Sequence, residues 1–157
     1  MGRRVSFVLA AIAMVLAAGA ATAAAKPSPK AVFNARVRAV GTEAQKAILA
    51  MPTQASPSAA ESAAAVAQLQ AVYQRVAQRL AALTPPLAIK RDFKILVAAY
   101  RADVKYAGAW HDALLHGSAQ DAADASSALY NSPETYHASL ALVRMTQKGY
   151  YFGTFFR

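Results

Sequence analysis

Apolar residues recur every three or four positions along most of this chain, and this spacing predicts α-helices rather than strands. The first such run covers residues 31–51, and Pro52 ends it, since proline cannot continue a helix. The apolar positions of this run are Phe33, Val37, Val40, Ala44, Ala47 and Met51. We therefore expect an amphipathic helix that packs this face inward.

Two further helices have clear start and stop signals. Ser58 precedes Glu61 by three residues, which is the spacing of a capping box, and the Thr-Pro-Pro sequence at residues 84–86 ends the helix that follows. A third helix is expected over residues 87–116, with Gly117 directly after its end. The apolar positions of these helices are Val66, Leu69, Tyr73, Val76, Leu80 and Leu83, and then Phe93, Val97, Tyr100, Val104, Ala107, His111 and Leu114.

The last helical segment covers residues 119–148, after a second capping box at residues 118–121. Pro133 lies in its middle, and Ser132 with Pro133 could begin a fresh helix. The apolar spacing nevertheless stays in phase across the proline. Its members are Ala122, Leu129, Tyr136, Leu140 and Val143. We therefore predict one helix that is kinked near Pro133 and ends at Gly149.

Four amphipathic helices with short connections predict an all-α fold, an antiparallel up-down-up-down four-helix bundle. The bundle domain is expected to cover residues 31–149, after a proline-rich leader at residues 26–30 and before an aromatic tail at residues 150–157. We expect this tail to fold back over the open end of the bundle. The alternative is that its rings anchor a partner or a membrane interface. The oligomeric state stays open.

Residues 1–25 are predicted to be a signal peptide, which forms a helix before it is removed. Two arginines supply positive charge, residues 5–18 are an apolar run too short to span a bilayer, and an A-x-A cleavage site ends at Ala25. We expect a secreted or periplasmic protein, cleaved near Ala25. No later segment is apolar for long enough to predict an integral membrane protein.

The net positive charge of the chain favours anionic partners. Beyond the predicted signal peptide, 15 lysines and arginines and 8 aspartates and glutamates give a net charge of +7. Four of the cations recur along the third helix, beside its apolar face: Lys90, Lys94, Arg101 and Lys105. Such a stripe is typical of a solvated helix face, and it could also bind an anionic envelope polymer or membrane surface. Nucleic acid is not expected as a partner, because no aromatic residue is interleaved with the stripe.

No catalytic motif is present in the sequence. It has no G-x-S-x-G, no glycine-rich phosphate loop and no H-E-x-x-H, and its carboxylates are too scattered to predict an acid–base pair. It also has no cysteine, which excludes disulfides, thiolate metal sites and a lipidated cysteine at the cleavage site. We therefore predict a protein that is not an enzyme and has neither a catalytic nor a metal site.

His111 is the one polar residue within these apolar stripes. A buried imidazole needs a partner for each ring nitrogen, which a side chain, a carbonyl, water or a bound ligand would supply. Met51 is expected near the same end of the bundle, because the first and third helices run parallel. His111 and Met51 are therefore the candidate ligands for the alternative function, a carrier of haem or another small ligand. No cofactor is expected otherwise.

Three features carry a resemblance to known proteins: the LTPP break at residues 83–86, the Gly-Ser turn at 117–118 and GYYFG at 149–153. Together they resemble uncharacterised secreted or lipoprotein-like, alanine-rich helical-bundle proteins of bacteria, although the lipoprotein cysteine is missing. That resemblance implies a fold and an exported location but no activity. The layout is also similar to periplasmic four-helix b-type cytochromes. Those proteins hold haem with a Met early in the first helix and a His late in the fourth, and this chain has neither.

Overall fold

The computed structural model of the chain describes residues 26–52 and 57–153. These residues form five α-helices, a short 3-10 turn and no strand, so the prediction of an all-α fold is confirmed for this part of the chain. In chain order the elements are α1 (Pro29–Leu49), α2 (Ala59–Ala81), η1 (Leu87–Ile89), α3 (Lys90–His116), α4 (Ala119–Tyr130) and α5 (Pro133–Gln147). The predicted signal peptide lies outside the described residues. None of the described helices combines the length and the hydropathy needed to cross a membrane.

Both predicted capping boxes are present. Ser58 Oγ accepts a hydrogen bond from the Glu61 amide at 3.2 Å, and the Glu61 carboxylate accepts one from the Ser58 amide at 2.8 Å. Ser118 and Asp121 make the same pair of bonds at the start of α4. Each box satisfies backbone donors that a helix leaves free at its start, and this fixes where α2 and α4 begin.

The last helical segment is two helices, so the prediction of one kinked helix is wrong. The α4 helix ends at Tyr130, and Ser132 has an extended backbone (φ −65°, ψ 147°) before α5 begins at Pro133. Ser132 is buried, and its Oγ accepts a hydrogen bond from the Thr135 amide at 3.1 Å. A serine N-cap followed by proline at N1 overrides the continuous apolar spacing, because proline lacks the amide that an unbroken helix needs there.

This break changes which face of α5 lies inward. Tyr136, Leu140 and Val143, which were predicted to continue the buried stripe, are 64%, 39% and 54% exposed. The extended backbone at Ser132 resets the helical phase, so the spacing carried across the proline faces solvent. The buried residues of α5 are Ala138, Ala141 and Met145.

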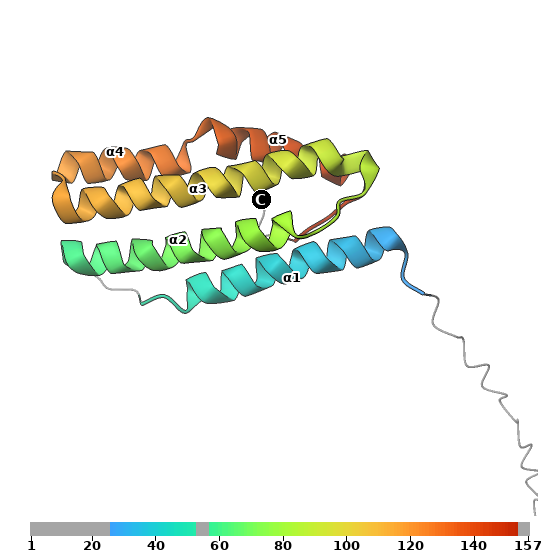
Figure 1. The fold of residues 1–157 in the computed structure, drawn as a ribbon, viewed down its shortest axis with the longest axis horizontal. Helices are drawn as coiled ribbons and strands as arrows, with labels where there is room; N and C mark the ends of the chain where they lie inside the picture. Colours follow the sequence, from blue (N-terminus) through green and yellow to red (C-terminus); the bar gives the residue numbers. More distant parts are fainter. Residues whose placement is uncertain (1–25, 53–56, 154–157) are drawn as a thin grey trace, which may run out of the picture.

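The helices lie side by side in the order α1, α2, α3 and then the α4–α5 pair (Figure 1). The α3 helix packs against α2, α4 and α5, and α1 packs against α2. The main core lies toward the connection between α2 and α3, and its largest fully buried side chains are Val37, Leu80, Ile89, Phe93, Leu96 and Met145. A smaller cluster lies toward the other end of α3 and contains Val66, Ala107 and Leu129.

A Schellman motif ends α5 and turns the chain back. Gly149 adopts a φ of +75°, as glycine does after many helices. The Tyr150 amide donates to the Met145 carbonyl at 2.9 Å, and the Gly149 amide donates to the Thr146 carbonyl at 2.7 Å. The predicted end of the helical segment at Gly149 is confirmed.

The segment after Gly149 covers the main core. Tyr150 and Phe152 are buried, and the Phe152 ring meets those of Phe33 and Phe93 edge to face, with centroids 6.0 and 6.4 Å apart. The Lys30 ammonium lies 4.9 Å from the centre of the Tyr150 ring, which ties the start of α1 to this segment. Residues 150–153 therefore fold back as expected, and the rest of the predicted tail lies outside the described residues.

Candidate anionic-surface site

Charge is divided unequally along this chain. Residues 75–105 carry seven lysines and arginines and two aspartates, whereas residues 106–143 carry four carboxylates and no lysine or arginine. The α3 helix runs from one end of the molecule to the other (Figure 1). The molecule therefore has a basic end at the α2–α3 connection and an acidic end at the α3–α4 turn.

Three grooves surround the α2–α3 connection at the basic end. One lies between the end of α2 and the start of α3 and has a volume of about 400 Å³. A second, of about 700 Å³, runs along α3 from Leu87 to Ala98, and a third, of about 730 Å³, lies between the start of α1 and the Pro85-Pro86 turn. Lys90 lines all three, so the grooves adjoin one another.

Cationic and apolar side chains line these grooves together. The cations are all exposed and are called the basic corner below: Arg36, Lys90, Arg91, Lys94 and Arg101. In the groove between α2 and α3, the apolar lining includes Leu80, Leu83, Phe93 and Val97. Within the described residues, no aspartate or glutamate lines any of the three grooves. The site therefore suits a ligand with both negative charge and apolar surface.

Asp92 is the carboxylate closest in sequence to the basic corner, and it forms ion pairs with Arg144 and Lys148 at the end of α5. It is buried, and its oxygens accept hydrogen bonds from Arg144 Nε at 2.7 Å and Lys148 Nζ at 3.3 Å. Burial alone would raise the pKa of Asp92, but the hydrogen bonds and charges of these two cations outweigh it and lower the pKa. Asp92 therefore stays ionised, and it lines none of the three grooves.

The position of the basic corner in α3 opposes the helix dipole. Lys90 and Arg91 are the first two residues of α3, where the helix carries partial positive charge, and Lys94 follows one turn later. No side chain caps the start of η1 or of α3. Cations at this end of a helix cost stability, so their gathering here is not explained by the folding of α3.

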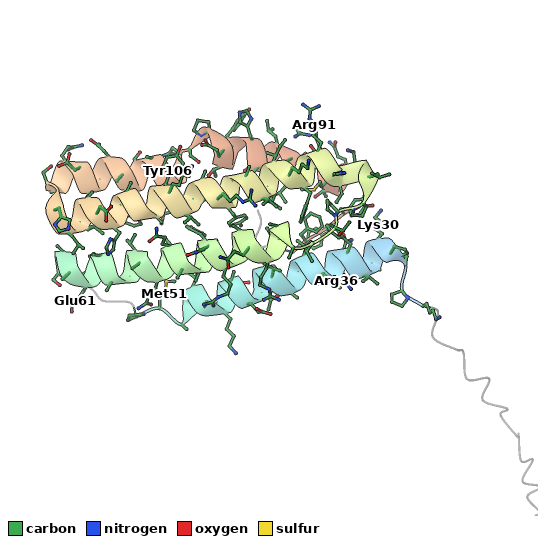
Figure 2. The ribbon with its side chains drawn as sticks, viewed as in Figure 1. Lys30, Arg36, Met51, Glu61, Arg91 and Tyr106 are labelled. Carbon is green, nitrogen blue, oxygen red and sulfur yellow. The ribbon has the colours of Figure 1, made fainter. Side chains whose placement is uncertain are left out.

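An exposed apolar residue projects from the same corner. Leu87, the first residue of η1 after the two prolines, is 87% exposed. Figure 2 shows Lys30, Arg36 and Arg91 toward this end of the molecule, with Glu61 at the opposite end. The corner thus presents a leucine surrounded by cations, which is the combination that membrane-surface segments use.

The structure brings together three of the four residues that the sequence predicts for anion binding. Lys90, Lys94 and Arg101 line the groove between α2 and α3, while Lys105 is exposed farther along α3 and lines none of the three grooves. Arg36 was not predicted. In the sequence it is a single cation next to the apolar face of the first helix. Only the packing of α1 on α2 places it beside the Pro-Pro turn.

The two candidate ligands of the alternative function lie in different surroundings. His111 is half-buried near the end of α3, and its Nδ1 lies 3.2 Å from Asp112 Oδ1 on the same helix. Met51 follows the end of α1 and packs against the main core. Neither residue lines the grooves of the basic corner. The carrier hypothesis stays a prediction from the sequence.

A second cluster of polar side chains lies where α5 begins, and this cluster is acidic, whereas the basic corner is cationic. The Tyr106 hydroxyl donates to Glu134 Oε2 at 3.2 Å, and Asp103 Oδ1 is buried without a hydrogen-bond partner among the described residues. Burial and the charge of Glu134 raise the pKa of Asp103 to about 6, although a hydrogen bond from Thr135 acts to lower it. This group titrates in a mildly acidic range and does not suit an anion.

No protein-family model matches this chain, and no curated protein or solved structure is detectably similar to it. The function therefore has to be argued from the site itself.

Proposed function

We propose that this protein is an exported, non-enzymatic up-down-up-down helical bundle that binds the anionic lipid surface of the cell envelope through its basic corner. The observation that supports this most is the gathering of exposed cations from α1 and α3 around three adjoining grooves that no carboxylate lines. The predicted signal peptide would deliver the chain to that surface. The resemblance to secreted bundle proteins points the same way.

A lipid surface suits the corner better than a hydrophilic anionic polymer does. Leu87 is almost fully exposed beside Lys90 and Arg91, and a bilayer interface would cover the leucine while its headgroups pair with the cations. A polymer would pair with the same cations but would leave the leucine in water. The exposed leucine therefore favours lipid.

The expected binding is reversible. A lysine or arginine near an anionic bilayer contributes about 1 kcal/mol, so the five cations of the corner supply at most about 5 kcal/mol. Burying Leu87 adds about 1.5–3 kcal/mol. The sum corresponds to a dissociation constant of roughly micromolar to submillimolar order. Attachment of this strength should weaken strongly as salt rises, because exposed charges are screened.

Co-sedimentation with vesicles tests the proposal. The full chain is expressed, the N-terminus of the accumulated protein is determined by mass spectrometry, and binding to phosphatidylglycerol and phosphatidylcholine vesicles is compared from low to high salt. Binding to the anionic vesicles alone, lost at high salt, is expected. Wall fragments form a third arm, and binding to these without binding to vesicles would contradict a lipid partner.

Matched variants locate the binding surface. Lys90→Glu with Lys94→Glu should weaken binding to anionic vesicles at least about tenfold. Lys46→Glu makes the same type of change in the last turn of α1, outside the three grooves, and should have little effect. The corner variant reverses two charges and the Lys46 variant one, so an equal loss of binding free energy per reversed charge would indicate that net charge alone drives binding, and the proposal would fail.

A further inference from the structure

The groove between the end of α2 and the start of α3 has an apolar floor that belongs to the main core. Leu80, Phe93 and Val97 line it, and all three are buried. The other uncharged residues along it are apolar too, and among the described residues no serine, threonine, asparagine or glutamine lines it. Apart from its cations, the groove offers a ligand no polar side chain. It therefore favours a ligand with a substantial apolar part.

The α3 side of this groove is cationic. Lys90, Lys94 and Arg101 are exposed and follow one another at spacings of four and seven, which places them on one side of α3. Within the described part of the chain, none of these three cations forms an ion pair with a carboxylate. Their charges are therefore available to a ligand. A row of cations beside an apolar floor is complementary to a molecule that joins an anionic group to a hydrocarbon chain.

Two alanines leave the groove open. Ala81 is the last residue of α2, and Ala98 lies on α3 between Lys94 and Arg101. Both alanines are exposed and line the groove, so a larger side chain at either position would occupy part of it. The volume of about 400 Å³ lies within the range of small-molecule sites.

The length of the groove suits one acyl chain. Its α3 residues extend from Lys90 to Arg101, which is about 16 Å at the helical rise per residue. One acyl chain spans half the hydrocarbon core of a bilayer, or about 15 Å. Lys90 also lines the two adjoining grooves and follows the exposed Leu87 by three residues, so the groove between α2 and α3 opens at the basic corner.

We propose that this groove holds one acyl chain of a single anionic phospholipid, whose phosphate pairs with Lys90 and Lys94. This inference rests on the proposed function and deepens it, because the corner that binds the lipid surface would also take up one lipid from it. A free phosphate would pair with the cations and leave the apolar floor in water. A neutral hydrocarbon would cover the floor and leave the cations without a partner. An anionic lipid satisfies both.

Single-chain lipids below their critical micelle concentration test the groove without a bilayer. Lysophosphatidylglycerol is titrated calorimetrically into the protein expressed as the full chain, with lysophosphatidylcholine and glycerol 3-phosphate as the other arms. One lysophosphatidylglycerol should bind per chain, at least about tenfold more tightly than either control, because it alone joins a chain to a net negative charge. Its binding enthalpy should become more negative as temperature rises, since apolar burial lowers the heat capacity.

Variants that fill the groove locate the chain. Ala81→Trp and Ala98→Trp should each weaken lysophosphatidylglycerol binding at least about tenfold, because each methylene group kept out of the groove weakens binding about fourfold. Ala109→Trp is the matched control, since Ala109 is also an exposed alanine of α3 but lines none of the three grooves. Circular dichroism checks that each variant is folded. Both groove variants should still sediment with anionic vesicles, because the cations and Leu87 are unchanged.

The outcomes separate this inference from the proposed function. A wild-type protein that sediments with anionic vesicles but binds no lysophosphatidylglycerol overturns the groove proposal and leaves the proposed function standing. A wild-type protein that binds neither overturns both. Glycerol 3-phosphate or lysophosphatidylcholine that binds as tightly as lysophosphatidylglycerol overturns the groove proposal. So does lysophosphatidylglycerol binding that Ala81→Trp and Ala98→Trp leave unchanged.

Discussion

The basic and acidic ends of this bundle differ in how far the fold itself explains their charges. At the acidic end, Asp121 completes a capping box at the start of α4, as Glu61 does for α2. A carboxylate at the start of a helix stabilises it. At the basic end, Lys90 and Arg91 occupy the start of α3, where a cation is unfavourable. Capping therefore accounts for Asp121 and Glu61 at the acidic end, whereas the helix dipole does not account for the cations at the start of α3.

The two ends also differ in packing. The aromatic rings of Phe33, Phe93 and Phe152 meet in the core behind the basic corner. Among the described residues, the cluster toward the acidic end has three buried members, Val66, Ala107 and Leu129. The basic end can therefore keep cations that lower its stability. Their unfavourable interaction with the helix dipole costs less free energy than the burial of the aromatic rings contributes.

Removing the ring that closes the dense core should have the largest effect. Phe152→Ala is expected to lower the free energy of unfolding by about 3–5 kcal/mol, because it leaves a cavity between Phe33 and Phe93. Tyr151→Ala, at the exposed position next to it, should cost less than about 1 kcal/mol. Urea denaturation measures both. Similar costs for the two variants would contradict the role of residues 150–153 as a cover for the core.

Breaking the buried ion pair at the basic end should have the next largest effect. Asp92→Asn is expected to cost about 1–3 kcal/mol at neutral pH, since Arg144 and Lys148 lose their carboxylate partner but can regain water. Because the folded pKa of Asp92 is lowered, its contribution to stability is present above its ordinary pKa of 3.8 and is lost as pH falls through the folded pKa. Denaturation curves of the two proteins should therefore converge at low pH. A difference that persists there would contradict this account.

Replacing Asp103, near the start of α5, should change stability less than replacing Asp92 does, and with the opposite pH dependence. The pKa of Asp103 is raised to about 6, so the wild-type protein loses stability as pH rises from the unfolded value of 3.8 through 6. Asp103→Asn should remove this loss and raise the free energy of unfolding at pH above 6 by about 1 kcal/mol, after allowance for solvent screening. Thermal unfolding over a pH series measures it. Equal pH dependence in the variant and the wild type would contradict the raised pKa.

Reversing a charge of the corner should have the smallest effect on stability. Lys90→Glu is expected to stabilise the protein by about 0.3–1 kcal/mol, because it places a carboxylate at the start of α3. Lys46→Glu, in the last turn of α1, should destabilise it by a similar amount. Only the Lys90 variant should lose vesicle binding. A Lys90→Glu protein that is less stable than the wild type would show that Lys90 serves the fold.

Much of this fold could be predicted from the sequence, because its signals are local. Serine capping boxes fix where α2 and α4 begin, and Gly149 fixes where α5 ends. The break before α5 was offered by Ser132 and Pro133 but was not predicted, because the apolar spacing stays in phase across it. The orientation of α5 could not be predicted from the apolar spacing. Its face depends on one extended residue, Ser132, and a continuous pattern across that residue indicated the wrong side.

The candidate site could be predicted only in part, because it joins separate elements. The regular spacing of Lys90, Lys94 and Arg101 on one helix was visible in the sequence. Arg36 joins them through the packing of α1 on α2, which no local pattern encodes. Leu87 lies in an apolar segment, so its sequence gives no sign that it is exposed. Its exposure results from the turn that follows the two prolines.

A fluorescent probe at Leu87 tests the central claim most directly. The chain has no cysteine, so Leu87→Cys, Leu49→Cys and Leu115→Cys each give one labelling position, at the basic corner, at the end of α1 and at the acidic end. With a polarity-sensitive label, anionic vesicles should shift the emission to the blue at position 87 and leave positions 49 and 115 unchanged. A shift at position 115 without one at position 87 would contradict binding through the basic corner.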